Sequence, residues 1–438
     1  MTRRRFVTAV CTYSAAVLGF LATVVAARTF STSVLGLYAI VIATTGFFQT
    51  FLDLTVEEVG VKYGFRYETR EEWGKLRRLF AGTLAWKLVG GALAAIAILA
   101  LAPAAHAIFG DSRLTAPLAL GAAIPIAQAP EGLAGVALFL RGRYDVRAAF
   151  LTLSMALRLL AVIVGSRFGL TQTILAIVLA QVAATGAVGA AGWVAFRRFP
   201  RAPAEPLRSD RGDIVRFVLQ SSGATGVVAL RTALTLPLLG AVTSPAQAGF
   251  FKVAQTPQQG LATLSAPARM VLLTEQTRHW ERGSREAVLA GVRRYSTRAG
   301  LLMLLAVPPL LWFMPDIVRI VFKPRNLGAV DAARLVLLAG ALQFAVGWSK
   351  SLAITIGRPN LRIWTHGLET AVLLPLVVAF GGLWGATGAG AAVLVSTGAF
   401  VAAWAVLFLR ISRDTRDLPR PEERALDLVE PPAEVIVP

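Results

Sequence analysis

Long apolar segments recur along the whole 438-residue chain, and they decide what it can fold into. A helix needs about 20 mostly apolar residues to cross the hydrocarbon core of a bilayer. Many runs of this length follow one another, and 55% of all residues are hydrophobic, with a mean hydropathy of +0.63. Soluble domains are normally about 45–50% apolar. The chain is therefore expected to be an all-α polytopic membrane protein, because the strands of a membrane β-barrel would alternate in polarity.

Twelve membrane-spanning helices are predicted from these runs. Their approximate bounds are Val7–Ala27, Ser33–Leu54, Leu79–Ala102, Leu114–Leu138, Ala148–Gly165, Thr171–Phe196, Ile214–Gly240, Gln247–Leu273, Thr297–Val321, Ala329–Ile356, Ile363–Phe380 and Gly385–Leu409. The first run exceeds the apolar core of a typical cleaved signal peptide, about 7–15 residues, so it is interpreted as a span.

Basic residues are distributed unevenly between the two sides of this topology. Of the 44 Lys and Arg residues, 32 fall in the N-terminus, in loops after even-numbered spans and in the C-terminal tail, whereas six fall beside the loops after odd-numbered spans. The positive-inside rule then places both termini in the cytoplasm, with the protein in the inner membrane. The net charge of +19 is not interpreted as nucleic-acid binding, which would need a basic soluble module.

Four short matches at nearly the same offset indicate an internal repeat. Gly36 matches Gly249, Arg77-Arg78 matches Arg293-Arg294, Gly142-Arg143 matches Gly357-Arg358, and Gly169 matches Gly385, with offsets of 213 to 216 positions. The predicted organisation is a six-helix bundle at 1–200, a cytoplasmic linker at 201–213, a second six-helix bundle at 214–411 and a disordered cytoplasmic tail at 412–438. Two halves of the same orientation are related by an axis along the membrane normal and typically enclose a central cavity.

A polar stripe marks the eighth span. Lys252, Gln255, Thr256, Gln259 and Thr263 recur at spacings of three and four residues, which places them on one face of a helix. Such a face is expected to line a water-filled cavity. Polar contacts between packed helices are the alternative interpretation.

Cationic residues inside the spans suit an anionic ligand, because a charge at bilayer depth persists mainly beside water or a partner. Arg231 in the seventh span and Lys252 in the eighth are predicted to lie at similar depths and to form one anion site. Arg28 would lie at its outer rim, and Arg158 lies near the middle of the fifth span. Arg forks and Lys point charges are suited to holding a diphosphate.

Two acids, Glu131 and Glu369, lie well inside predicted spans. They are candidates for binding a coupling ion, and they are also the expected partners of Arg158 or of Lys87. The energy source itself is left open by the sequence.

No catalytic or metal-binding arrangement is predicted. The sequence has no GxxxxGK[ST] phosphate loop, and its three histidines, His106, His279 and His366, are dispersed. No enzyme activity, no cofactor and no metal site are therefore expected.

Two stretches resemble a known family. The segment RTFSTSVLGLYAIVIATTGFFQTFLDL from Arg28 resembles the opening of bacterial oligosaccharide flippases, the polysaccharide-biosynthesis branch of the multidrug/oligosaccharidyl-lipid/polysaccharide exporter superfamily. In the second half, IGRPNLRIW and GGLWGATGAGAAVL resemble that family's loop before span eleven and its small-residue entry to span twelve. The resemblance covers about residues 5 to 410.

The resemblance implies translocation of an undecaprenyl-diphosphate-linked oligosaccharide from the cytoplasmic to the outer leaflet, for surface polysaccharide assembly. Arg231, Lys252, Arg28 and Arg158 are then the candidates for diphosphate binding. Gln255, Gln259, Thr256 and Thr263 are the candidates for sugar hydroxyls. The expected partners are the lipid-linked substrate, membrane lipids and a glycan polymerase or other assembly protein, with the flippase itself a monomer that binds no nucleic acid.

Three alternatives stay open at this point. A peptidoglycan-precursor flippase of the same superfamily would typically carry fourteen spans. A cation-coupled multidrug exporter would need an acidic site in its N-terminal half, for which Asp53 and Glu131 are the candidates. A non-transport membrane scaffold would make the intramembrane charges dispensable.

Overall fold

The chain folds into helices throughout the part that the structure describes. This computed structural model describes residues 2–52, 56–208, 210–264, 272, 276, 279–280, 284–356, 358 and 360–416, and no strand occurs among them. Asp53, one of the two acids considered for a drug-exporter site, lies outside these residues. So do residues 417–438, most of the predicted tail, whereas the last helix continues through the tail's first residues to Arg416.

Most of the N-terminal half consists of long, uninterrupted helices. They are α1 (Thr2–Thr29), α2 (Thr32–Leu52), α3 (Val56–Thr69), α4 (Trp73–Leu101), α5 (Ala105–Phe109), the 3-10 helix η1 (Ser112–Leu114), α6 (Thr115–Gly121), α7 (Ala123–Leu140), α8 (Tyr144–Gly165) and α9 (Leu170–Arg197).

The C-terminal half contains more breaks. Its helices are α10 (Arg211–Ala233), α11 (Thr235–Val242), α12 (Pro245–Ala254), α13 (Thr256–Leu264), α15 (Arg285–Trp312), α16 (Met314–Phe322), η2 (Pro324–Ala329), α17 (Val330–Ala345), α18 (Ser349–Thr355) and α19 (Asn360–Arg416).

The prediction of a multi-pass helical membrane protein is confirmed. Within the described residues, nine helices are long and apolar enough to cross a membrane, or ten if the bent pair α15 and α16 forms one span. α19 contains both the eleventh and the twelfth predicted spans. The two parts meet at a kink at Gly385, where φ is 60° and the backbone is not helical. The eighth predicted span coincides with α12 and α13, which are separated at Gln255, and extends into residues outside the described part.

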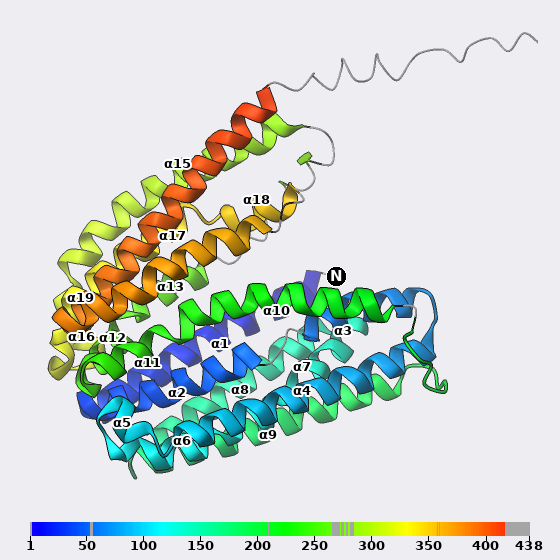
Figure 1. Ribbon diagram of the computed structural model, residues 1–438, viewed down its shortest axis with the longest axis horizontal. Helices are drawn as coiled ribbons and strands as arrows, with labels where there is room; N and C mark the ends of the chain where they lie inside the picture. The colour runs from blue at the N-terminus through cyan, green and yellow to red at the C-terminus, as the bar shows by residue number, and fades with distance from the viewer. Residues whose placement is uncertain are drawn as a thin grey trace, which may run out of the picture.

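The helices form two arms that meet at one end and diverge toward the other (Figure 1). The N-terminus lies at the diverging end, α11, α12 and α16 lie at the meeting end, and α2 runs from there along the first arm. One apolar core joins the arms there and includes Leu37 and Ile40 of α2 with Phe251 of α12. Separate apolar cores lie inside each arm, around Tyr67 in the first and Trp404 in the second. The joint is therefore a packed contact between the two halves.

Two glycines from the sequence repeat meet at this joint. A Cβ atom built on Gly36 would overlap the Pro245 carbonyl, and one built on Gly249 would overlap the Thr32 carbonyl. The contacts are reciprocal at the repeat offset, since Thr32 and Pro245 are also 213 positions apart. The backbones of α2 and α12 can approach this closely only because both residues lack a side chain.

A second pair of repeat glycines turns the chain at matching places. Gly169 precedes α9 with φ 117°, and Gly385 lies inside α19 with φ 60°. Both are backbone conformations that favour glycine. The repeat predicted from sequence is thus visible in both packing and backbone geometry.

Candidate functional site

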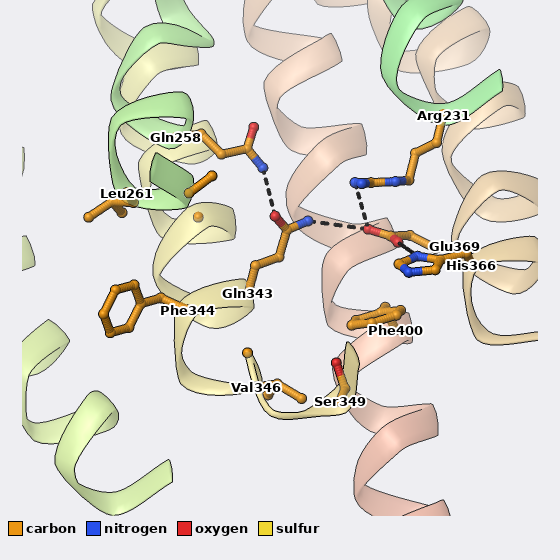
Figure 2. A pocket seen from close by; sticks show the side chains of 13 residues that line it. Arg231, Gln258, Leu261, Gln343, Phe344, Val346, Ser349, His366, Glu369 and Phe400 are labelled. Atoms are coloured by element: carbon orange, nitrogen blue, oxygen red, sulfur yellow. Dashed lines mark hydrogen bonds and ion pairs between the residues drawn. The ribbon is translucent and has the colours of Figure 1, made fainter. Parts of the chain in front are cut away.

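Glu369 of α19 is the centre of a buried polar cluster formed by three helices of the C-terminal half. Its side chain is 2% exposed, and its Oε1 accepts from Arg231 Nη1 at 3.2 Å and from Gln343 Nε2 at 3.3 Å. The second carboxylate oxygen lies 3.1 Å from His366 Nδ1. Figure 2 shows these side chains converging from α10, α17 and α19. Several hydrogen bonds from three helices allow a carboxylate to remain buried.

The cluster continues toward the polar face predicted for the eighth span. Gln258 Nε2 of α13 donates to Gln343 Oε1 at 3.2 Å, and Gln343 Nε2 also lies 3.4 Å from Thr397 Oγ1. These residues border a cavity of about 50 Å³ that Arg231, Gln258, Gln343 and Glu369 help to line. A polar cavity of this volume has room for water.

The first arm contains a comparable cavity of about 70 Å³. Lys87, whose side chain is 3% exposed, forms an ion pair of 2.9 Å with Glu57. Glu131 Oε2 accepts from Gln181 Nε2 at 3.0 Å, and Arg147 Nη1 donates to the Glu131 carbonyl at 3.0 Å. Two cations and two carboxylates therefore share this cavity, and their pairing compensates the cost of burying Lys87.

The two cavities occupy equivalent positions of the repeat. Pro125, Gln128, Ala129 and Glu131 line the first, while Gly340, Gln343, Phe344 and Val346 line the second. Each residue of the first set lies 215 positions before its counterpart in the second. Gln128 and Gln343 are identical residues. The position of Glu131 is taken by Val346 in the second cavity, whose carboxylate comes instead from Glu369 on a different helix.

Lys252 of α12 and Arg158 of α8 come from opposite halves of the chain, and their charges lie within range of mutual electrostatic repulsion. Both side chains are half-buried, and within the described part of the chain neither forms an ion pair or side-chain hydrogen bond. Two neighbouring cations without a carboxylate repel each other, so an anion placed between them would be stabilised.

The other predicted residues of the polar stripe lie along α12, α13 and the break between them. Thr256 Oγ1 lies 3.5 Å from the Lys252 carbonyl, and Thr263 Oγ1 donates to the Gln259 carbonyl at 3.0 Å. Gln255 is half-buried and Gln259 exposed, and neither side chain has a hydrogen bond to another described residue.

Arg28 lies at the joint between the arms. Its Nη1 lies 3.4 Å from the Ile320 carbonyl, and Arg325 Nη2 donates back to the Arg28 carbonyl at 2.6 Å. The predicted rim residue thus takes part in a contact between α1 and the segment from α16 to η2.

Two ion pairs differ from those considered in the sequence. Lys87 forms an ion pair with Glu57, although it lines the same cavity as Glu131. Arg231, predicted to share an anion site with Lys252, forms an ion pair with Glu369.

Several cluster residues were not expected from the sequence: Glu57, Gln128, Arg147, Gln181, Gln258, Gln343 and His366. One signal was available for two of them, because Gln128 and Gln343 are identical residues at the repeat offset.

The fold is shared with transporters of known structure. A multidrug resistance MATE family transporter of the MOP superfamily in its inward-facing conformation has a TM-score of 0.73 and 13% identity, covering 92% of this chain and 96% of that chain. Lipid II flippase MurJ in an inward closed conformation has a TM-score of 0.71 and 12% identity, covering 94% of this chain and 90% of that chain.

Similarity is lower to a MATE family transporter of the MOP superfamily in its outward-facing conformation. The TM-score there is 0.54 at 13% identity, with 94% of this chain and 97% of that chain covered. No curated protein sequence matches the chain significantly.

A sequence model of one family matches residues 1–273, which is more than half of the chain. Its description is "Polysaccharide biosynthesis protein". Both the family match and the shared fold agree with the resemblance noted in the sequence. The chain therefore belongs to the polysaccharide biosynthesis protein family and has the fold of the MOP superfamily transporters.

Proposed function

We propose that this protein is a flippase that moves an undecaprenyl-diphosphate-linked oligosaccharide from the cytoplasmic to the outer leaflet for surface polysaccharide assembly. It acts in the inner membrane, with both termini in the cytoplasm, as a transporter without enzyme activity. Family membership supports the link to polysaccharide biosynthesis. The fold shared with a lipid II flippase supports the transport of a lipid-linked substrate.

The pair of Lys252 and Arg158 carries this proposal. The two cations come from opposite halves, lie within range of mutual repulsion and have no acidic partner within the described residues. A diphosphate between them would relieve their repulsion and contact both halves at once. Gln255, Thr256, Gln259 and Thr263 follow Lys252 along the chain, at the end of α12 and on α13, and would supply polar groups for sugar hydroxyls.

The arrangement of the arms supports alternating access. The arms diverge on the side of the N-terminus (Figure 1), which the positive-inside rule assigns to the cytoplasm. The higher similarity to an inward-facing transporter than to an outward-facing one is consistent with this direction. Arg28, at the joint, would become accessible to the diphosphate when the arms reverse.

Glu369 and Glu131 are the proposed coupling-ion residues. Each is a carboxylate beside a small water-sized cavity, with Arg231 or Arg147 close by. Binding of a proton or other cation to Glu369 would weaken its hold on Arg231. Arg231 would then be released toward an anionic substrate, which links ion binding to substrate binding.

The test uses purified protein in liposomes that contain a fluorescent undecaprenyl-diphosphate-linked oligosaccharide. Lys252→Glu and Arg158→Glu are expected to reduce translocation to the level of empty liposomes, because each places an acid in the proposed diphosphate site. Arg319→Glu, at an exposed position on α16, is the matched control and should keep wild-type activity.

The same liposomes separate the competing functions. Lipid II in place of the oligosaccharide tests a peptidoglycan-precursor flippase, and a cationic dye tests a multidrug exporter. Wild-type translocation of the oligosaccharide in both charge-reversed variants would rule out the assigned diphosphate site. Absence of any translocation by the wild-type protein would favour a scaffold.

A further inference from the structure

An apolar groove lies on the first arm, apart from the two small polar cavities described above. Its volume is about 540 Å³, and α4, α7 and α9 form it together with residues of the linker after α9. Leu84, Leu133 and Trp193 represent its three helical walls. Gly192 forms its floor, since a Cβ atom there would collide with Ala134 of α7. The close approach of α9 to α7 leaves an open channel between α4 and α9.

The groove faces lipid. α4 and α9 lie along the edge of the first arm that is farthest from the second arm (Figure 1). Trp86 of α4 and Trp193 of α9 are both 58% exposed, as expected for side chains in contact with a bilayer. A hydrocarbon chain from the surrounding membrane can therefore reach the groove directly.

At one end of the groove, two arginines form cation–π contacts with aromatic rings that line it. The guanidinium of Arg77 lies 5.4 Å from the centre of the Phe196 ring, and that of Arg197 lies 5.5 Å from the centre of the Trp193 ring. Arg77 also donates to the Pro200 carbonyl from Nε at 3.3 Å and from Nη2 at 3.2 Å. These bonds fix the guanidinium in place and leave Nη1 available to a further acceptor.

The rest of the rim adds positive charge. Arg78, Arg198 and Arg201 are exposed beside the same end, and Glu205 is the acid of the linker that packs against Gly74. Arg77 precedes the predicted start of the third span by two residues, whereas Leu84 lies about 10 Å farther along the helix. The groove thus has a cationic end at the membrane surface and an apolar end at membrane depth.

We infer that this groove binds an anionic phospholipid of the bilayer. Its phosphate would lie against Arg77 and Arg197, and one acyl chain would fill the channel between α4 and α9. The charge at the rim selects an anionic headgroup over a zwitterionic one. The proposed function assigns the substrate to Lys252 and Arg158, which do not line this groove, so this lipid is a second ligand, and the inference holds whatever glycan is transported.

The test measures which lipid the detergent-purified full-length protein retains, by native mass spectrometry with added phosphatidylglycerol or phosphatidylethanolamine. The wild-type protein should retain one molecule of phosphatidylglycerol in preference to phosphatidylethanolamine. Gly189→Phe should abolish this retention, because Gly189 lines the groove and has open space around it. Gly186→Phe, on the same helix, also in open space and not part of the groove lining, is the matched control.

A second pair of variants tests the headgroup contact. Arg77→Ala should weaken phosphatidylglycerol binding about fivefold, as expected for one arginine near an anionic lipid. Arg216→Ala, at an exposed position on α10 outside the groove and its rim, should leave it unchanged. Equal retention by all variants, or equal retention of both lipids, would overturn the inference. Undecaprenyl phosphate displacing phosphatidylglycerol from this groove at a lower concentration would assign it to the substrate instead.

Discussion

Glu369 determines how the intramembrane charges of the C-terminal half are arranged. Its carboxylate interacts with the side chains of Arg231, Gln343 and His366. Arg231 Nε, in contrast, is buried without a hydrogen-bond partner among the described residues. The carboxylate therefore has three neighbours, but the guanidinium depends on one acid. Removing either member of the ion pair leaves a different residual charge.

Glu369→Ala should destabilise the protein more than Arg231→Ala does. Loss of the acid leaves a buried guanidinium unpaired, at a cost of about 3–5 kcal/mol. Loss of the arginine leaves Glu369 still bound by Gln343 and His366. The measurement is the apparent melting temperature of the purified variants. Replacing both residues, in Arg231→Met with Glu369→Leu, should recover part of the loss, and the opposite order of the two single variants would contradict the assigned geometry.

At the scale of elements, the crossing of α2 and α12 limits how the two arms can close. Gly36 and Gly249 bring backbone against backbone there, so the contact has no flexible side chain that could yield. Gly46, farther along α2, offers a comparison on the same helix, because a Cβ atom added there would meet no described atom within 4 Å. The distance between the arms at the joint is therefore set by the direct backbone contact of α2 with α12.

Gly36→Ala should separate the arms at their joint. The added methyl group would collide with the Pro245 carbonyl, and overpacking of this kind typically costs about 1–3 kcal/mol. Spin labels at Thr29 and Arg319, in a Cys11→Ser background, report the distance across the joint. It should lengthen in Gly36→Ala and stay unchanged in Gly46→Ala. An unchanged distance in both variants would mean that the crossing does not control closure.

These elements could be predicted from sequence to different degrees. Uninterrupted apolar runs predicted α1, α2 and α9 well, because a helix must satisfy its own backbone inside a bilayer. α12 and α13 are separated at Gln255, two residues before Pro257, which lies in the first turn of α13, where proline is tolerated. Proline is thus the sequence signal that marks this interruption of the eighth predicted span.

At the scale of the whole molecule, sequence indicated which charges are intramembrane but not which of them meet. Arg231 and Glu369 are 138 positions apart, and their pairing depends on α10 lying beside α19. Helical periodicity assigns a residue to a face of its own helix and says nothing about the neighbouring helix. The same limit explains the unexpected pairing of Lys87 with Glu57, since α3 packs back on α4.

Cross-linking the joint should stop transport, because alternating access requires the arms to separate at this end and close at the other. Thr32 Oγ1 lies 3.4 Å from the Arg325 carbonyl, so cysteines at these two positions can be joined by a short cleavable cross-linker. In a Cys11→Ser background, the cross-linked protein should translocate no lipid-linked glycan, and reduction of the linker should restore activity. Each single-cysteine variant is the control. Full activity of the cross-linked protein would exclude opening at this end.

The reciprocal contact of Gly36 with Gly249 also bears on where such a chain comes from. In a symmetric homodimer, a residue on the two-fold axis touches its own copy in the partner, and one substitution alters both sides of the interface. Here the two copies are joined in one polypeptide, so each glycine can change alone, but the other must tolerate the change. Residues 36 and 249 are therefore expected to co-vary among related chains, so that a larger side chain at one position is accompanied by a compensating change at the other.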